Sequence, residues 1–504
     1  MKKWIIGLMA GATLAAGAVD MRPNIVFIMA DDLGLGDVSH HVQQIQKKTP
    51  LVPTPAIDEL AQSGMWFTDA HSSTSLCSPT RYCVMSGNMN YRSYAPWGVW
   101  GTFRENAIKP GQATLGTVAR DAGYATGFIG KWHLGGDFLN RKTGELYRGD
   151  DHKNPDSPVD LAKMVGGGPV QLGFDYSFML PCGVQGPIYM VYENNEWYPL
   201  GRDSKIVYLD ETTAKDPKIV SDKGPGKGDS NWDTAGMGQR LSAKAVDFIH
   251  EKAGKEAFFL CYWSPTVHIP HCPPDEFDGV KIKGSTPTPH MDMIRDLDLQ
   301  VARIIKALKD KGVYDNTLIV FTSDNGGLPN GASIDVGHNP NGGWRGHKNA
   351  PYEGGHRVPF IAVWKGKIVP GSVSDEAIIN HDMLATMATL LKVKVPKDEA
   401  MDSLNLLPLL TGKCGFEPRE YLMLQSGCYF ETMLRDGDWK LIMASDYNSS
   451  KFEPVALFNL SKNPVEDETQ NLVKHPEQQE RVKAIHKKYL SIRESGARTT
   501  PSLD

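Results

Sequence analysis

The chain has 504 residues, which at roughly 100 to 200 residues per domain predicts one large domain with an appendage, or two to three domains. Hydrophobic residues make up 40% and charged residues 22%, with 50 Gly and 33 Pro. This composition excludes a disordered, collagen-like or coiled-coil chain. Because 54 Lys and Arg nearly balance 59 Asp and Glu, we expect no nucleic-acid partner, and an anionic ligand must be bound at a local site.

The N-terminus has the layout of a secretory signal peptide. Lys2 and Lys3 precede an apolar run at 4–14, and small residues follow at 16–18, as in signals with a small-residue cleavage site. We expect residues 1–18 to be removed and the protein to be exported, to the periplasm or the cell exterior. A membrane anchor is the alternative, but the run is shorter than the ~20 residues of a spanning helix. We therefore expect no stable membrane insertion.

Several apolar runs, each followed by polar residues, predict the strands of a buried sheet. They lack period-two alternation, which is typical of parallel strands covered on both faces. Helical patterns lie between them, starting at Thr54 and Pro55, over 115–122 and over 293–311. The alternation predicts an α/β fold with a large, mostly parallel but mixed central sheet flanked by helices. The runs are residues 24–30, 125–130, 258–263 and 317–322.

Two other regions differ in composition and in hydrophobic periodicity. Residues 139–233 are rich in Gly, Pro and charge with little periodicity, so we expect long loops that determine substrate specificity. After residue 412, short strand-like pieces precede a charged helix that ends near Glu494. We expect a main domain over 19–412 and a smaller α+β domain over 413–504.

Acidic and amide side chains follow two of the predicted strands. Asp31 and Asp32 come after the first, and Asp324 and Asn325 after the last. Ligands of open α/β sheets bind beyond the carboxyl ends of the strands, so we expect the polar groups there to converge. Adjacent carboxylates require a cation or several donors, and hard oxygens without clustered His or Cys suit calcium or magnesium rather than zinc. The alternative is that these residues only cap turns or helices.

The segment that contains Cys77 predicts an anion site. Ser78 and Pro79 have the pattern of an N-cap and first helical position, which places Cys77 beside free backbone N–H groups that favour an anion. Arg81, in the first turn, can point to the same place. By these residues alone, Cys77 is either a low-pKa nucleophile or a packed thiol.

The chain has seven cysteines, an odd number that leaves one thiol over in an exported protein. No pair has CxxC spacing, and most are expected to be buried apolar residues or disulfide bridges. They are Cys77, Cys83, Cys182, Cys261, Cys272, Cys414 and Cys428.

Two long motifs give the chain a specific resemblance to a known family. Residues 77–81 (CSPTR), followed by Ser86 and Gly87, resemble the C-x-P-x-R signature of the formylglycine-dependent type I sulfatases, which belong to the alkaline-phosphatase-like superfamily. Residues 123–133 (GYATGFIGKWH) resemble their second signature. Further matches make the resemblance span nearly the whole mature chain. They are Asp31 and Asp32, residues 268–270, residues 324–326, residues 345–348 and residues 353–355.

The resemblance implies an enzyme that hydrolyses sulfate esters, and we expect its substrate to be a sulfated carbohydrate. It implies that a maturation enzyme converts Cys77 to formylglycine. It also implies one metal ion, calcium before magnesium. The implied metal ligands are Asp31, Asp32, Cys77, Asp324 and Asn325. The implied catalytic residues are Cys77, Arg81, Lys131, His133, His268 and Lys348.

Two alternative functions remain open. Related enzymes on this fold hydrolyse phosphate or phosphonate esters, and some share C-x-P-x-R. A glycan-binding protein without catalysis is the other, although every motif position is filled. We further expect aromatic side chains to contact the sugar, with packing beneath the loops as the alternative, while His271 and Arg295 are weaker candidates for sugar contact. The aromatic residues are Trp97, Trp100, Tyr189, Tyr192 and Trp197.

Overall fold

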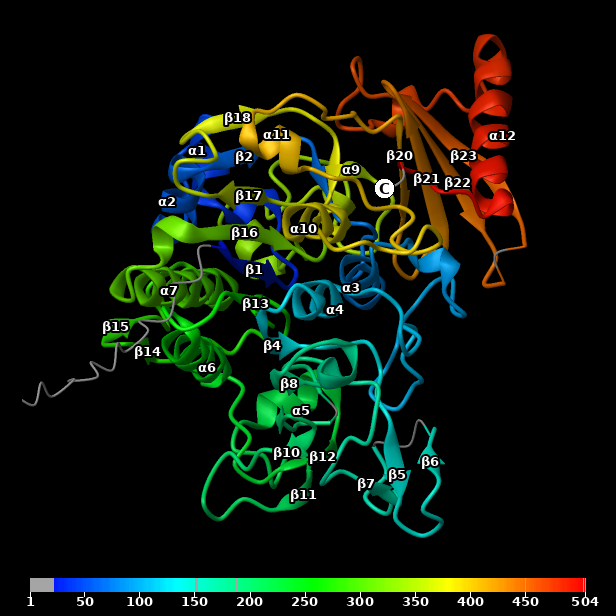
Figure 1. Ribbon diagram of the computed structural model, residues 1–504. Coiled ribbons are helices and arrows are strands. Elements are labelled where there is room, and N and C mark those ends of the chain that lie inside the picture. The colour runs from blue at the N-terminus through cyan, green and yellow to red at the C-terminus, as the bar shows by residue number, and fades with distance from the viewer. Residues whose placement is uncertain (1–21, 150–152, 187, 449, 502, 504) are drawn as a thin grey trace, which may run out of the picture.

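The structure is a computed structural model that describes residues 22–149, 153–186, 188–448, 450–501 and 503. The expected signal peptide at 1–18 lies outside these residues. A large central sheet lies between two layers of helices, and a smaller sheet with one long helix lies beside it (Figure 1). The predicted α/β class and the small antiparallel sheet near the C-terminus are both confirmed. The exact domain boundary at residue 412 stays a prediction.

The four predicted strands form the middle of a ten-stranded mixed sheet. Its order is β10-β9-β8-β4-β13-β1-β16-β17-β2-β18. The pairs β4 with β13, β13 with β1, and β1 with β16 are all parallel, and every residue in these strands is buried. Their bounds are β1 (Asn24–Ala30), β4 (Ala125–Lys131), β13 (Phe258–Trp263) and β16 (Thr317–Ser323).

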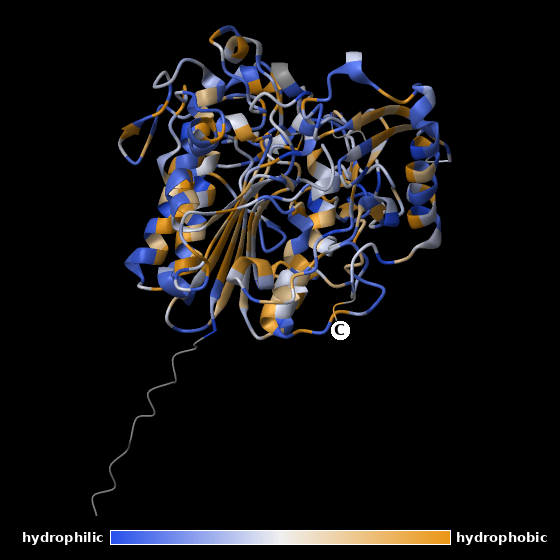
Figure 2. Cartoon of the chain, turned by 90° about the horizontal axis from the view of Figure 1, so that it is seen from above, coloured by the Kyte–Doolittle hydropathy of each residue, from blue (hydrophilic) through white to orange (hydrophobic). Residues whose placement is uncertain are grey.

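Alternate residues of β1 enter two separate hydrophobic cores. Ile25, Phe27 and Met29 pack with α3, α4 and α10 on one face, and Val26 and Ile28 pack with α2, α6 and α7 on the other. Figure 2 shows hydrophobic residues concentrated in the central strands. The helices are α2 (Pro55–Ser63), α3 (Cys77–Ser86), α4 (Leu115–Asp121), α6 (Met237–Lys252), α7 (Pro289–Asp310) and α10 (Met383–Leu391).

The expectation that residues 139–233 form only loops is wrong. The apolar strand β8 (Tyr176–Leu180) pairs in parallel with β4 and extends the central sheet, because pairing with a neighbour stabilises a strand too short to stand out as a pattern. Pairs of short strands surround it. The segment contains β5 (Phe138–Asn140), β6 (Leu146–Tyr147), β7 (Val159–Asp160), β9 (Tyr192–Glu193), β10 (Glu196–Trp197), β11 (Ile206–Leu209), α5 (Pro217–Lys223) and β12 (Gly226–Asp229).

The C-terminal sheet has four antiparallel strands and one covering helix. Tyr489 of the helix packs with Leu434 and Leu441 on the outer face, whereas Met433 and Ile442 pack with Ile379 toward the main domain. The elements are β20 (Tyr421–Gln425), β21 (Glu431–Asp436), β22 (Trp439–Ser445), β23 (Phe452–Asn459) and α12 (Gln479–Ser495).

The remaining α-helices and strands are short, and three of them, β17, β2 and β18, complete one side of the main sheet. They are α1 (Ser39–Gln44), β2 (Met65–Phe67), β3 (Ala70–His71), β14 (Glu276–Phe277), β15 (Val280–Lys281), α8 (Gly331–Asp335), α9 (Glu353–His356), β17 (Phe360–Val363), β18 (Ser372–Ser374), β19 (Ile378–Ile379) and α11 (Leu407–Thr411). All seven cysteines are free thiols, five buried and two exposed. Within the described residues, no helix combines the length and apolar character needed to cross a membrane.

A buried carboxylate joins two of the helices. Asp298 of α7 accepts hydrogen bonds at Oδ1 from the backbone N–H groups of Ala56 (3.0 Å) and Ile57 (2.9 Å) at the start of α2. These N–H groups have no partner within their own helix. The side chain of Thr54, the residue before the helix, makes no capping hydrogen bond to them. The contact with Asp298 therefore supplies the acceptor that these donors need.

We expect Asp298→Ala to lower the free energy of unfolding by about 2 kcal/mol, because it leaves buried N–H groups without acceptors. Urea unfolding measures this change. The matched control is Asp310→Ala, which removes an exposed ion pair to Lys306 on the same helix and should cost less than about 0.5 kcal/mol. Equal effects of the two substitutions would contradict the prediction.

Candidate active site

Side chains from four strands meet at one edge of the central sheet. Asp31 and Asp32 follow β1, Asp324 follows β16, Lys131 ends β4, and His268 lies in the loop after β13. Because these strands are adjacent and parallel, their carboxyl ends lie at the same edge. The expected convergence of the strand ends is thus present in the structure.

The acidic and amide groups form one buried cluster. The Asp32 backbone N–H donates to Asp324 Oδ1 (3.2 Å), and Asn325 Nδ2 donates to Asp32 Oδ1 (2.9 Å). Asp31 Oδ1 and Asn325 Oδ1 are buried without a hydrogen-bond partner. Ligand atoms of Asp31, Cys77 and Asp324 lie within 4.8 Å of one another. Unpartnered buried oxygens of this kind fit a hard divalent cation.

Burial and neighbouring charges shift the pKa values of two carboxyl groups in this cluster in opposite directions. Burial alone opposes ionisation of Asp31, but the charges of Lys131 and Arg81 lower its pKa. For Asp324, burial and the nearby Asp31 charge raise the pKa to about 7. A cation at the unpartnered oxygens would favour the ionised form of every carboxyl group in the cluster.

Each carboxylate of the cluster has a buried lysine or arginine within hydrogen-bond distance. Lys131 Nζ lies 2.7 Å from Asp31 Oδ2, Lys348 Nζ lies 2.7 Å from Asp32 Oδ1, and Arg81 lies 2.7 Å from Asp324 Oδ2. Arg81 also donates to the Lys131 backbone carbonyl (3.0 Å). Arg81 therefore orients Asp324 and the end of β4, rather than pointing freely toward a ligand.

Cys77 is the first residue of α3, so the expected start of this helix at Pro79 is wrong. Pro79 is tolerated in the first turn because a helix leaves its first N–H groups without internal partners. Ser78 does not cap the helix, and its Oγ donates to the His133 carbonyl (2.8 Å). The Cys77 thiol is buried, and burial raises its pKa. The structure therefore argues against a low-pKa thiolate.

His133 lies beside the sulfur, with its Nδ1 3.4 Å from Cys77 Sγ. The backbone of His133 is left-handed (φ 57°), as is that of Asp32 (φ 62°). Such conformations cost about 1–3 kcal/mol at residues other than glycine and recur at functional sites. A hydrogen bond from the His133 N–H to the Pro181 carbonyl (2.8 Å) helps to hold this geometry.

His268 is oriented by its own loop. Its Nδ1 lies 2.6 Å from the Ile269 carbonyl, to which it donates, and its Nε2 lies 3.7 Å from Asp32 Oδ2. Burial and the Lys348 charge lower the pKa of His268 to about 3. The imidazole is therefore neutral, with Nε2 free to accept a proton.

Sequence reasoning missed two supporting segments. The carbonyls of Leu180 and Pro181 accept the N–H groups of Trp132 and His133. Ser75 accepts from the Asn349 N–H (2.7 Å) and thereby joins the segment before Cys77 to the segment after Lys348. Ser75 and Asn349 lie next to motifs in the sequence, whereas Leu180 and Pro181 lie far from any of them.

Most aromatic residues expected to contact a sugar pack beneath the loops instead. Trp97, Trp100, Tyr189 and Tyr192 are at most 5% exposed. Trp197 is partly buried, and its Nε1 donates to Asp229. Large rings are stable there because they bury much apolar area.

The contacts of His271 and Arg295, the two weaker candidates, give no evidence for a role in sugar binding. The His271 ring lies 5.0 Å from the His290 ring, between ring centres. No contact of Arg295 with the site residues is present among the described side chains.

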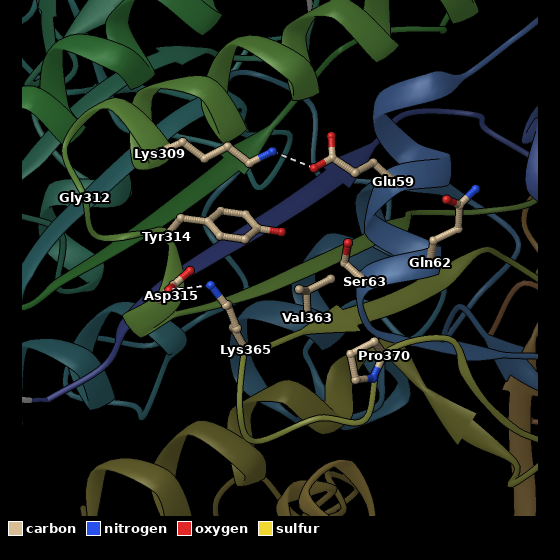
Figure 3. Close-up of a pocket in the computed structure, with 10 residues that line it drawn as sticks. All are labelled: Glu59, Gln62, Ser63, Lys309, Gly312, Tyr314, Asp315, Val363, Lys365 and Pro370. Atoms are coloured by element: carbon tan, nitrogen blue, oxygen red, sulfur yellow. Dashed lines mark hydrogen bonds and ion pairs between the residues drawn. The ribbon is translucent and has the colours of Figure 1, made fainter.

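Two of the surface cavities differ in their position relative to these residues. One of about 450 Å³ is lined by residues 94–100, Arg104, Tyr447 and Asn448, and its Gly98 faces Pro79 in the helix that begins with Cys77. Another of about 620 Å³ lies at the opposite edge of the sheet, near the start of β16, with ion pairs at its rim (Figure 3). The second cavity contains none of the predicted site residues.

Comparison with known proteins agrees with this geometry. A family model described as Sulfatase matches residues 23–393. An N-acetylgalactosamine-6-O-sulfatase of Bacteroides thetaiotaomicron is 31% identical, covering 92% of each chain. Human arylsulfatase A is 29% identical, covering 90% of this chain and 84% of its own.

Solved structures agree as well. A sulfatase from a study of glycosaminoglycan metabolism by Bacteroides thetaiotaomicron has a TM-score of 0.76 and 28% identity, over 94% of this chain and 100% of its own. A phosphonate monoester hydrolase of Agrobacterium radiobacter, at 16% identity and a TM-score of 0.58 over 94% and 96%, shares the fold. The chain therefore belongs to the sulfatase family of sulfuric ester hydrolases, within the alkaline-phosphatase-like superfamily.

Proposed function

We propose that this sulfatase removes sulfate from a sulfated carbohydrate, using formylglycine at position 77 and one bound calcium ion. The observation that carries the proposal is the convergence at one sheet edge of unpartnered buried oxygens, Cys77 and two buried lysines. Such a site can bind a cation and an anion side by side. The same proposal includes export directed by a signal peptide at residues 1–18 and modification of Cys77 by a maturation enzyme.

The metal would be held by Asp31, Asp32, Asp324, Asn325 and the modified Cys77. Calcium is favoured over magnesium because it accepts six to eight oxygen ligands in flexible geometry, whereas magnesium requires a near-ideal octahedron. When bound, the ion would stabilise negative charge on the oxygens at the reacting sulfur.

Formylglycine would supply a hydrated aldehyde, whose two hydroxyls allow attack on sulfur and later release of sulfate. His133 is placed to take a proton from the second hydroxyl, since its Nδ1 lies 3.4 Å from the sulfur that occupies this position. Burial, together with the charges of Lys131 and Arg81, lowers the pKa of His133 well below its usual value. A neutral imidazole of this kind can act as the base.

Basic side chains would neutralise the sulfate and assist departure of the alcohol. Lys131 and Lys348 are buried and form ion pairs with Asp31 and Asp32. Either His268 or Lys348 would protonate the leaving oxygen. The contacts favour Lys348 as the proton donor. The Nδ1–H of His268 already donates to the Ile269 carbonyl, and its Nε2 carries no proton to give.

Two observations support a carbohydrate substrate. A relative that is 31% identical and covers 92% of this chain is named an N-acetylgalactosamine-6-O-sulfatase. The 450 Å³ cavity beside the Cys77 helix combines exposed tyrosines, Tyr94 and Tyr447, with Arg104 and Asn448. Flat rings with polar neighbours suit sugar faces and hydroxyls.

We expect Cys77→Ala to abolish turnover while the protein stays folded, because alanine cannot form an aldehyde hydrate. The control is Cys83→Ala, which removes another buried thiol of the same helix and should keep its activity. Peptide mass spectrometry at position 77 measures the modification, and initial rates measure turnover. Full turnover by protein with unmodified Cys77 would contradict the proposed mechanism.

Metal analysis should find about one calcium ion per chain, and chelation should abolish turnover. Asp324→Asn should lower the calcium content, because it removes a charged ligand. Asp296→Asn neutralises another buried carboxyl, on α7, and should leave calcium bound. Two zinc ions, or full activity after chelation, would favour the phosphatase-type alternative.

A panel of sulfated mono- and oligosaccharides, a chromogenic aryl sulfate and matching phosphate esters tests the substrate class. N-acetylgalactosamine 6-sulfate is the first sugar to include. We expect Tyr447→Ala to lower kcat/KM on oligosaccharides about fivefold, equivalent to about 1 kcal/mol of ring contact, with little change on the aryl ester. Tyr429→Ala, also exposed but outside the cavity, is the control.

Far higher kcat/KM on the aryl ester than on every sugar would overturn the carbohydrate assignment. Faster turnover of phosphate than of sulfate esters would favour the phosphorus-ester alternative.

A further inference from the structure

A second buried cluster of charged side chains joins the C-terminal sheet to the active-site segments. It lies between β22, α9 and β3, and it includes two histidines at the contact between the domains. Glu353, Glu466, His71, His356 and Lys440 are each at most 1% exposed. The other members are Asp69, Arg357 and Arg435.

Lys440 of β22 contacts three side chains of this cluster through its ammonium group. Its Nζ lies 2.9 Å from Glu353 Oε1, 2.8 Å from Glu466 Oε1 and 2.9 Å from His356 Nε2. An ammonium group has no acceptor. His356 Nε2 must therefore accept, and it carries no proton.

This contact determines the tautomers of both histidines. Burial and Lys440 lower the pKa of His356 well below its usual value, so its ring is neutral and its proton lies on Nδ1. That proton points to His71 Nδ1, 2.9 Å away. His71 then carries its proton on Nε2 and donates it to Asp69 Oδ1, at 2.8 Å. One chain of hydrogen bonds thus runs from β22 to Asp69.

Two arginines complete the cluster and balance its charges. Arg357 contacts Glu353 Oε2 (2.5 Å) and Asp69 Oδ1 (2.8 Å), and Arg435 contacts Asp69 Oδ2 (2.7 Å). Three positive groups, counting Lys440, thus oppose three carboxylates. Replacing a compensated buried ion cluster by apolar side chains often costs little stability. Stability alone is therefore a weak reason for its presence.

Backbone hydrogen bonds connect the cluster to the Cys77 segment, and connect the C-terminal sheet to both catalytic segments. The His356 carbonyl accepts the Ser72 N–H (2.7 Å), and the Ser75 N–H donates to the carbonyl of Gln425, the last residue of β20 (2.9 Å). On the other side, the Gly427 N–H donates to the Asn349 carbonyl (3.0 Å). Ser75 lies two residues before Cys77, and Asn349 directly follows Lys348.

We propose that Lys440 is a positioning residue for the sulfatase reaction: through this cluster the C-terminal sheet holds the Cys77 and Lys348 segments in their reactive geometry. The inference rests on the roles that the proposed function gives to those two residues. Lys440 itself touches none of the six catalytic candidates, so its effect is carried by His356, Ser72 and the adjoining backbone.

The test variant is Lys440→Met/Glu466→Gln, which removes one positive and one negative charge and keeps the cluster balanced. We expect kcat per formylglycine on a chromogenic aryl sulfate to fall about 10- to 100-fold, because a displacement of about 1 Å costs up to about 100-fold. KM should change less than about threefold. Near-UV circular dichroism measures folding, and mass spectrometry measures the formylglycine content.

The matched control is Lys488→Met, which removes an ion pair to Glu420 within the C-terminal domain and away from the cluster. It should leave kcat unchanged. His356→Leu keeps all the charged groups but interrupts the histidine chain, and we expect it to lower kcat in the same way. It serves as the test where the double variant does not fold.

A folded double variant, or folded His356→Leu, with kcat within about twofold of the wild type would overturn the inference, even with a lower Tm. Absence of sulfate turnover by formylglycine-containing wild type would instead contradict the proposed function. The wild-type rate and the variant-to-wild-type ratio therefore separate the two failures.

Discussion

The structure depends on placing several carboxylates in one buried cluster. Asp31, Asp32 and Asp324 lie together at the sheet edge and are at most 2% exposed. Buried like charges are unfavourable unless opposite charges compensate them. One lysine or arginine 2.7 Å from each carboxylate provides this compensation. Two further oxygens of the site, Asp31 Oδ1 and Asn325 Oδ1, have no hydrogen-bond partner and fit a cation. The four parallel strands bring these groups together because their carboxyl ends share an edge.

The same constraint recurs at the contact between the domains. Around Lys440, three cationic and three anionic groups compensate one another with little solvent contact. The two clusters differ in what they hold. The first holds two unpartnered oxygens beside Cys77 and is suited to ligands. In the second, the ammonium of Lys440 contacts Glu353, His356 and Glu466 and thereby joins β22 to two other segments. The second cluster is therefore suited to holding the loops around the first.

Burial also changes the chemistry assigned to particular side chains. A thiol at a helix start is a candidate thiolate by position, yet burial raises the pKa of Cys77. His268, a general-acid candidate by motif, is neutral with a bare Nε2. Trp97 and Trp100 stabilise the loop beside α3 rather than offering an open face. These side chains differ from simple expectation because desolvation depends on neighbours distant in the chain.

The sequence by itself determined the family, the α/β class and the four central strands, because long buried apolar runs and two ordered motifs are local signals. It also located the small C-terminal sheet. Only the tertiary structure decided the strand order, the pairing of β8, the start of α3 at Cys77 and the pairing of Arg81 with Asp324. The partners of Lys440 were equally invisible, since Glu353 and His356 lie 87 and 84 residues away in the chain and Glu466 lies beyond the next strand. Local patterns report how a segment folds, whereas compensation of buried charge depends on contacts that only the folded chain makes.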